Sequence, residues 1–512
     1  MSDIYFTSNP SDYAKLPGLY IAERGPTGFI RGADLSTTGL AGRCVRGPDD
    51  PQTITDVGRF IEVFGSRDQG SGGAVVGQIW QALLNKSFGT VVAQRVRASD
   101  AVKASFTLET ATGGGGTAVL RVDASSVGAW GNLVGVSTVA ATDGVSTHFD
   151  LLVQYLGKTI RLPNLNINTS IDDNTASVVG ADVARLVDLT KLASGRPVNS
   201  TASTDGADAN GFILLGSTVA AFVSVLGSEG TLAVSDYNGG VNALAVFPGI
   251  SVVLVPEIVA GSASTFHANL VTLAPLVSDR IFLTWAQAHG QSVSTEVTQI
   301  GTQITTRTDR IVWAYNSAYT IDPTTSQEVQ TAPHVWLASI LSRVDVDIHA
   351  GSFQTVALLA GVTRVTATTL TRPDLIALEQ AGISTLERNG DGFQFRDTLT
   401  TSLQPGRTQL ARRRMADFYL LSVARRLRVY VKGKNTPTIR AQMAGEVTAF
   451  STQLQRAERV VEDFSIDSKS VNTAAQRAQG QEHLFVQVDL IGHMLALVID
   501  AQIETGLVIE HQ

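Results

Sequence analysis

The sequence predicts a multidomain α/β (α+β) protein with an α/β sandwich core, an inserted mostly-β domain, a C-terminal α+β domain and extended arms at both ends. Its 512 residues, of which 44% are hydrophobic, exceed one ordinary core and suffice for several. Helical stretches separate the near-continuous apolar runs "ISVVLVP", "RIFLTWA" and "RIVWAYN", which is typical of strands buried on both faces of an α/β layer. Between residues 103 and 225 alternating apolar and polar runs predominate, and they favour a β insertion.

The first part of the core is expected at residues 21–102. The preceding residues 1–20 are polar and interrupted by prolines, so they predict an extended N-terminal arm. The first helix has Thr55 or Asp56 as its N-terminal cap and Gly65 as its stop. The elements predicted here are a strand at 19–24, helices at 53–66 and 74–87, and a strand at 90–96.

The insertion is expected at residues 103–225, with strands in "TAVLRVDA", "LVGVSTVA" and "HFDLLVQYL" and one helix at 177–190. Within it, "GAWGN" (128–132) has glycines on both sides of Ala129-Trp130, which allow a tight turn. We interpret this stretch as a structural corner, at which the Trp130 side chain fills apolar space, rather than as a ligand site. The α/β core then resumes at residues 226–360.

A C-terminal α+β domain is expected at residues 361–490, followed by an apolar C-terminal arm at 491–512. The predicted elements are a short proline-started helix in "TRPDLIALEQ", a hairpin around "NGDG" (389–392), helices at 407–434 and 436–460, and a strand at 482–490. Thr436 and Pro437 occupy the cap and first-turn positions of the second long helix.

The composition argues against several classes of partner and site. The net charge of −7 argues against nucleic acid as the main partner. One cysteine, Cys44, excludes an intramolecular disulfide and a cysteine-rich metal site. The N-terminus lacks the basic and apolar regions of a signal peptide, and no apolar run reaches 18 residues, so we expect no membrane insertion.

Motifs that would carry catalysis or bind a cofactor or metal are missing. "YLGKT" (155–159) resembles the end of a phosphate loop, but position 152 is Leu where the first glycine is required. The eight histidines show no metal-binding spacing, and no G-x-S-x-G elbow occurs. Asp345 and Asp347 share one face of "VDVDIH" and allow a carboxylate pair, although a solvated strand edge is favoured. We therefore expect no enzyme and no cofactor, with an α/β-fold hydrolase as the disfavoured alternative.

The predicted helix at 407–434 carries a basic stripe opposite its apolar side. Its members are Arg414, Arg425, Arg428 and Lys432. A solvated face explains such a stripe by itself. A surface that meets an acidic partner is the alternative.

The order of these motifs resembles that of the contractile tail sheath proteins of phages, tailocins and related injection systems. The resemblance includes "LPGLYIAERGPTGFIRGADLSTTGLAGRCVRGP" (16–48), "VGRFIEVFGS" (57–66), the "GAWGN" corner, "GSEGTLAVSDYNGGVNAL" (227–244), "LASILSRVDVDIHAGSFQTVALLAGV" (337–362) and "LEQAGISTLERNGDGFQFRDTLT" (378–400). The chain departs from the family at "APHVW", "FQFRDT" and "IGH", where the family often has Pro-Ser, Trp-Gly-x-Arg-Thr and Pro.

The resemblance implies a structural subunit that forms stacked hexameric rings around an inner tail tube. It implies contraction by rigid-body rearrangement, which drives the tube through the target cell envelope. The implied partners are further copies of the chain, the tail tube protein, and baseplate and tail terminator proteins. The implied location is the virion tail, assembled in the cytoplasm of the host bacterium. Another ring-forming tail or baseplate component is the structural alternative.

The resemblance also assigns positions to the domains. The C-terminal domain would face the tube, with the basic stripe as the contact, and the insertion would lie outermost. The two arms would add strands to sheets of neighbouring subunits. The arm residues expected to do so are Leu19, Tyr20, Leu497, Ile499 and Ile503.

Overall fold

The structure, a computed structural model, describes residues 4–6, 19–21, 30–65, 90–111, 115–168, 186–201, 204, 207–217, 224–277, 279–321, 326–352, 358–467, 472–473 and 482–492. The chain forms two compact units, one of residues 34–413 and one that combines residues 1–33 with 414–512. The division falls inside helix α9 (Leu410–Leu427).

The larger unit contains an eight-stranded sheet with the order β21-β20-β16-β15-β14-β3-β5-β4. Its six central strands are parallel, and the edge strands β4 and β21 are antiparallel to their neighbours. The three predicted apolar runs become β14, β15 and β16, which confirms the α/β core. The strands are β3 (Thr38–Arg43), β4 (Gln52–Ile54), β5 (Val91–Val96), β14 (Val252–Leu254), β15 (Ile281–Thr284), β16 (Ile311–Tyr315), β20 (Ile383–Arg388) and β21 (Phe393–Phe395).

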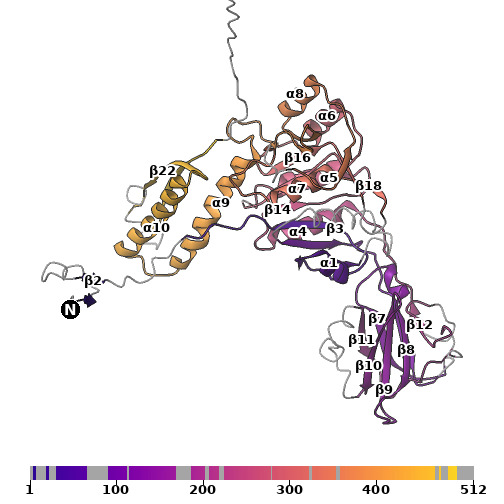
Figure 1. The fold of residues 1–512 in the computed structure, drawn as a ribbon. Helices are drawn as coiled ribbons and strands as arrows, with labels where there is room; N and C mark the ends of the chain where they lie inside the picture. Colours follow the sequence, from indigo (N-terminus) through magenta and orange to yellow (C-terminus); the bar gives the residue numbers. More distant parts are fainter. Residues whose placement is uncertain are drawn as a thin grey trace, which may run out of the picture. The chain divides into compact units, whose positions relative to one another are not determined.

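Helices cover both faces of this sheet (Figure 1) because successive strand residues point to opposite sides. On β3, Leu40 joins the apolar core under α1 and α7, whereas Ala41 joins the core under α4, α5, α6 and α8. The helices are α1 (Val57–Phe64), α4 (Val234–Val246), α5 (Ala263–Leu273), α6 (Val293–Gln303), α7 (Pro333–Leu341) and α8 (Arg372–Gln380). A small antiparallel sheet of the same unit has the order β18 (Glu328–Thr331), β17 (Ala318–Ile321), β19 (Val362–Val365).

Local sequence fixes several helix ends. The Asp56 carboxylate accepts the Arg59 N–H at 2.8 Å at the start of α1, and Gly65, with φ of 84°, ends that helix. At α8, Thr371 and Asp374 form a capping box. The ends of α1 agree with the predicted cap and stop.

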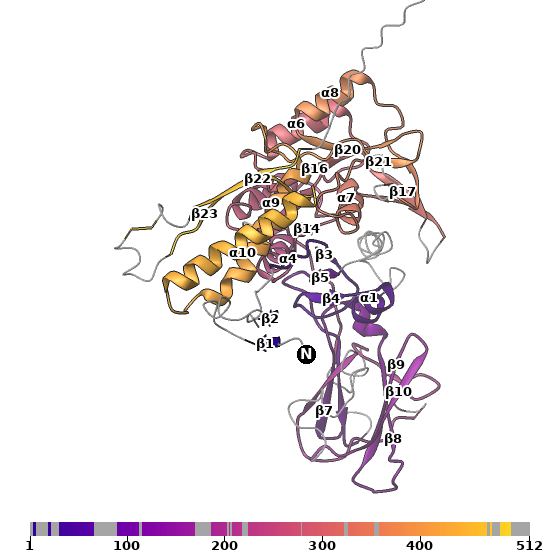
Figure 2. The ribbon, with the colours of Figure 1, turned by 60° about the vertical axis from the view of Figure 1, so that its left-hand side comes forward.

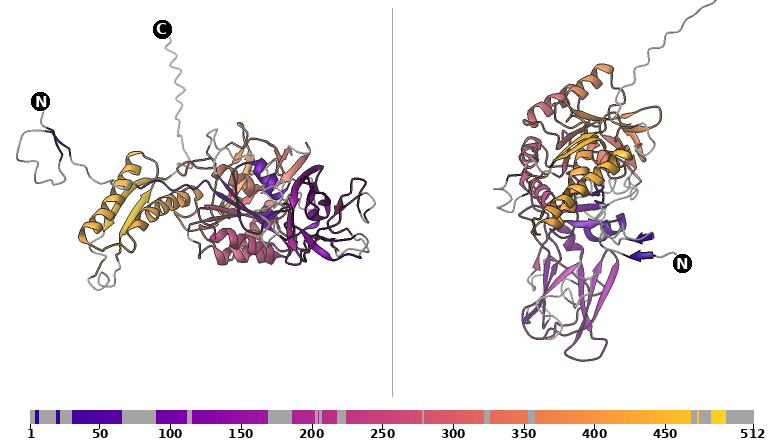
Figure 3. Two further views of the ribbon diagram at one scale, coloured as in Figure 1. Left: turned by 90° about the horizontal axis from the view of Figure 1, so that it is seen from below. Right: turned by 90° about the vertical axis from the view of Figure 1, so that its left-hand side faces the viewer.

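The insertion is a sandwich of two four-stranded antiparallel sheets, with the orders β10-β9-β8-β12 and β11-β7-β6-β13. A β-bridge between Val102 and Ser228 closes its base, and one apolar core fills the space between the sheets. Figure 3 shows this sandwich in purple from two sides. Its strands are β6 (Ser105–Glu109), β7 (Ala118–Ala124), β8 (Gly135–Ala140), β9 (Phe149–Tyr155), β10 (Lys158–Leu165), β11 (Val187–Lys191), β12 (Ile213–Leu214) and β13 (Ser224–Val225).

"GAWGN" forms a 3₁₀ turn (Ala129–Leu133) at the junction between the sandwich and the eight-stranded sheet. Trp130 is buried, and the Arg46 guanidinium lies 5.7 Å from the centre of its ring. From β5, the buried Arg95 donates to the Val127 carbonyl at 2.7 Å. The stretch is therefore a structural corner, as predicted, and it ties the insertion to the core.

The described residues of the smaller unit form two helices, a 3₁₀ turn and two pairs of strands. Helix α9 packs on α10, where the Tyr419 hydroxyl lies 2.6 Å from the Ser451 hydroxyl, and α10 packs on β22 (Figure 2). Thr436 caps α10 through the Ile439 N–H, as predicted. The elements are β1 (Ile4–Phe6), β2 (Leu19–Ile21), α9, η5 (Arg428–Tyr430), α10 (Pro437–Arg456), β22 (Val461–Asp467) and β23 (Phe485–Leu490).

Several elements differ from the prediction. The end of the predicted helix at 177–190 is strand β11, because Val187 and Leu189 alternate into the sandwich core and pair with β7. Asp345 and Asp347 lie in turns rather than on a strand edge. The predicted helix at 74–87 lies outside the described residues.

Domain boundaries also differ. The predicted boundary at residue 361 lies inside the larger unit, because β20 and β21 complete the eight-stranded sheet. The C-terminal unit instead begins at Arg414.

Candidate assembly surfaces

The structure separates the four residues of the predicted basic stripe. Arg414 is buried, because the first half of α9 is covered on more than one side, so it does not belong to an exposed stripe. Helix α9 ends at Leu427, which places Arg428 in the following 3₁₀ turn and Lys432 in a left-handed backbone conformation with φ of 69°. Arg425, Arg428 and Lys432 are exposed, and their side chains have no ion-pair partner among the described residues.

An ion pair that the sequence analysis missed joins α9 to α10. Arg426 donates to both carboxylate oxygens of Glu446, at 2.8 and 2.7 Å, and the Tyr430 hydroxyl donates to the same carboxylate at 2.7 Å. These hydrogen bonds hold the pKa of Glu446 below its usual range against the opposing effect of burial. Arg425 and Arg426 are adjacent in the sequence. Only tertiary packing therefore distinguishes Arg426, which pairs with Glu446, from the exposed Arg425.

The end of α9 and the start of α10 enclose a groove of about 720 Å³. Its lining is mainly apolar, with basic side chains and Glu482 among it. The lining residues are Ala424, Leu427, Arg428, Tyr430, Val431, Lys432, Gly433, Lys434, Asn435, Ile439, Met443 and Glu482. Val431 in this lining and Val429 next to it are 68% and 62% exposed, so apolar and basic side chains share one surface.

Strands β22 and β23 form a two-stranded antiparallel sheet that no other described strand extends. Alternate residues of β23 are exposed, with Phe485 the largest. A two-stranded sheet is marginally stable by itself, and its unpaired edges are templates for a further strand. The hairpin is therefore a candidate acceptor for a strand from another chain.

The structure describes the predicted strand residues of the N-terminal arm but not those of the C-terminal arm. Leu19 and Tyr20 lie in β2, which pairs in parallel with β1 of the same chain. Leu497, Ile499 and Ile503 lie outside the described residues.

The stretch that resembles a phosphate loop and the stretch predicted as a hairpin both form turns. "YLGKT" forms the β9–β10 hairpin, whose turn residues Leu156 and Gly157 have φ of 50° and 76°. In "NGDG", the Asn389 side chain accepts the Asp391 and Gly392 N–H groups and closes a turn. Within the described ranges, no group of three metal-ligating side chains occurs and no helix is long and apolar enough to span a membrane.

No protein-family model matches the sequence, and no curated protein matches it. Several solved structures, however, are similar. The sheath tail protein from Desulfitobacterium hafniense is 14% identical, with a TM-score of 0.57 over 93% of this chain and 100% of its own. The sheath tail protein Lin1278 from Listeria innocua is 12% identical, with a TM-score of 0.62 over 90% of this chain and 96% of its own.

A third similar structure is the helical sheath of the anti-feeding prophage in its contracted state. It is 9% identical, with a TM-score of 0.55 over 96% of this chain and 100% of its own. This chain has the fold of the tail sheath proteins. The match covers nearly the whole of each chain, so it includes the α/β core, the β sandwich and the C-terminal helices together.

Proposed function

We propose that the chain is the structural, non-enzymatic subunit of a contractile tail sheath. It polymerises as stacked hexameric rings around an inner tail tube and contracts by rigid-body rearrangement, which drives the tube through the target cell envelope. The observation that carries this proposal is the shared fold with sheath tail proteins over nearly the full length of both chains. Its partners are copies of itself, the tail tube protein, and baseplate and tail terminator proteins, in a tail assembled in the bacterial host.

Strand addition supplies the links between subunits in this proposal. No other strand among the described residues pairs with the β22–β23 hairpin, and the arms at residues 1–20 and 491–512 supply the added strands. Of the two edges, β23 is the better acceptor because Asp489 is its one charged residue, whereas β22 carries Glu462, Asp463 and Asp467.

The tube contact in this proposal is the surface around the end of α9. Arg425, Arg428 and Lys432 are exposed beside the apolar groove, which suits a partner with acidic and apolar groups. Exposed ion pairs contribute roughly 0–1 kcal/mol each, so they form a strong contact only when repeated over many subunits, and each can separate during contraction.

Electron microscopy of the purified full-length chain tests the proposal. We expect long striated tubes with six-fold end views. Compact particles that never polymerise, together with a turnover activity, would overturn it.

Charge reversal tests the tube contact. Replacing Arg425 and Arg428 by Glu should leave folding and self-assembly intact, because neither side chain has an ion-pair partner in the described part of the chain. Extended sheaths should no longer form on tubes, and empty contracted-like sheaths should accumulate. The control reverses Arg407 and Arg456, which are also exposed and change the net charge equally. If the first variant forms no polymers even without a tube, these arginines join sheath subunits instead.

A further inference from the structure

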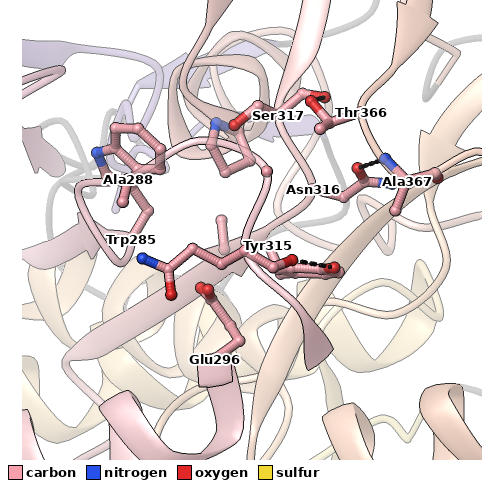
Figure 4. Close-up of a pocket in the computed structure, with 12 residues that line it drawn as sticks. Trp285, Ala288, Glu296, Tyr315, Asn316, Ser317, Thr366 and Ala367 are labelled. Carbon is pink, nitrogen blue, oxygen red and sulfur yellow. Dashed lines mark hydrogen bonds between the residues drawn. The ribbon is translucent and has the colours of Figure 1, made fainter. Parts of the chain in front are cut away.

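The larger unit contains a cavity of about 90 Å³ where β15 and β16 end (Figure 4). This volume is about that of three water molecules in the liquid. The lining comes from the loop between β15 and α6, from α6 itself, from the end of β16 and the residues after it, from the residues after β19, and from the start of α7. It consists of Trp285, Ala288, Gly290, Gln291, Glu296, Ala314, Tyr315, Asn316, Ser317, Pro333, Thr366 and Ala367. Gly290 is exposed and Ala288 half-buried, so the cavity reaches the surface on that side.

Two residues at or near the cavity have unusual backbone conformations. Gln287 and Asn316, each just beyond the end of a strand, have φ of 60° and 76°. The Asn316 side chain fixes its turn by accepting the Ala367 N–H at 2.8 Å and donating to two carbonyls. Non-glycine residues in the left-handed region cost free energy, and they concentrate at functional sites in proteins.

Three polar side chains at the cavity can accept hydrogen bonds. Glu296 is 2% exposed, and its carboxylate accepts the Trp313 indole N–H at 2.7 Å; Figure 4 shows this carboxylate pointing into the pocket. The Gln291 side-chain oxygen is buried without a hydrogen-bond partner. The Tyr315 hydroxyl donates to the Gln291 carbonyl, which leaves its oxygen able to accept. No Lys or Arg is among the described residues that line the cavity.

A buried carboxyl group with further acceptors beside it, and with no basic side chain in the described lining, favours a ligand that is cationic and carries N–H groups. Burial raises the pKa of Glu296 to about 7, because no cation compensates for the lost water. The Trp285 ring also lines the cavity, and aromatic rings attract cations. A guanidinium group is planar and presents paired N–H donors that match a carboxylate, whereas an ammonium group is a strongly hydrated point charge.

We propose that this cavity binds a guanidinium group, with Glu296 as its counter-ion and Gln291, Tyr315 and Trp285 as its further contacts. The group is carried either by a small free molecule or by an arginine side chain of another protein. The site is independent of the sheath proposal, since it lies in the described α/β core and uses none of the assembly surfaces.

Fluorine NMR of the unpolymerised full-length chain, labelled with 5-fluorotryptophan, tests the site. The chain has five tryptophans, and replacing Trp285 or Trp313 by Phe assigns their signals. Titration with methylguanidinium at pH 8 should shift both signals with a Kd of about 1 mM, and methylammonium should bind at least tenfold more weakly. Binding of N-acetylarginine amide as well would identify a side chain as the source, and binding of methylguanidinium alone would identify a free small molecule.

Two variants make the result decisive. Glu296→Gln keeps an acceptor for Trp313 but removes the charge, and it should weaken methylguanidinium binding at least tenfold. Gln291→Met removes the whole side-chain amide, its acceptor oxygen included, at nearly constant volume and should weaken binding several-fold. This variant tests the proposal if Glu296→Gln does not fold. Absence of saturable shifts, or equal affinity in wild type and both variants, would overturn the proposal.

Discussion

Replacing Val488 by Pro should block sheath polymerisation while leaving the subunit folded. The Ile491 N–H donates to the Val460 carbonyl across the hairpin, so alternate N–H groups along β23, at 489, 487 and 485, point toward β22. The N–H groups of residues 486, 488 and 490 then point to the open edge. A proline at 488 removes an outward donor and no hydrogen bond within the hairpin.

The structure sets the size of this effect. A strand added along Phe485–Leu490 gains a donor and an acceptor from each outward residue, about six backbone hydrogen bonds. At roughly 0.5–1.5 kcal/mol each, they contribute about 3–9 kcal/mol per link. Val488→Pro loses one bond and leaves the incoming carbonyl unpaired, which costs about 1–3 kcal/mol, or about 5- to 150-fold in the equilibrium constant of each link.

The assay compares circular dichroism, thermal unfolding and negative-stain micrographs of wild type, Val488→Pro and Val488→Thr. The threonine variant is the matched control, since it is β-branched like valine and keeps the backbone N–H. We expect normal tubes from Val488→Thr and folded, unpolymerised subunits from Val488→Pro. Normal tubes from the proline variant at the wild-type concentration would refute the assignment of the β23 edge as the acceptor.

Three further predictions concern the arms, the insertion and the core. Deleting residues 1–15, or 497–512, should leave folded subunits that form no tubes by electron microscopy; normal tubes from either truncation would show that this arm is not a linker. Replacing residues 105–222 by a short linker should keep the α/β core soluble, whereas loss of all soluble protein would mean that the insertion shares that core. Because the pKa of Glu296 is raised from 4.5 to about 7 on folding, folded chains keep a proton that unfolded chains lose between these values. The free energy of unfolding, measured with urea on unpolymerised chains, should fall by about 3 kcal/mol as pH rises across this window; Glu296→Gln should remove this fall, and an equal slope in the variant would exclude Glu296 as its cause.

Local sequence predicted the elements whose ends depend on neighbouring residues. Asp56 and Gly65 delimit α1 through hydrogen bonds within a few residues, and Thr436 starts α10 in the same way. The same kind of reasoning was wrong at Val187–Lys191, where a helical period and a strand alternation share the same apolar residues. Pairing with β7, which is distant in the sequence, decides between them.

By itself, the sequence determined the fold class, the strand-rich insertion and the absence of the motifs that an enzyme of a familiar type would carry. Only the tertiary structure decided which arginine is buried, which is paired and which is exposed along α9, and that no other described strand pairs with β22 or β23. It also brought Glu296, Gln291 and Trp285 around one cavity. The physical reason is that periodicity reports which side of an element is apolar, whereas burial, ion pairing and open edges depend on the segments that pack against it from elsewhere in the chain.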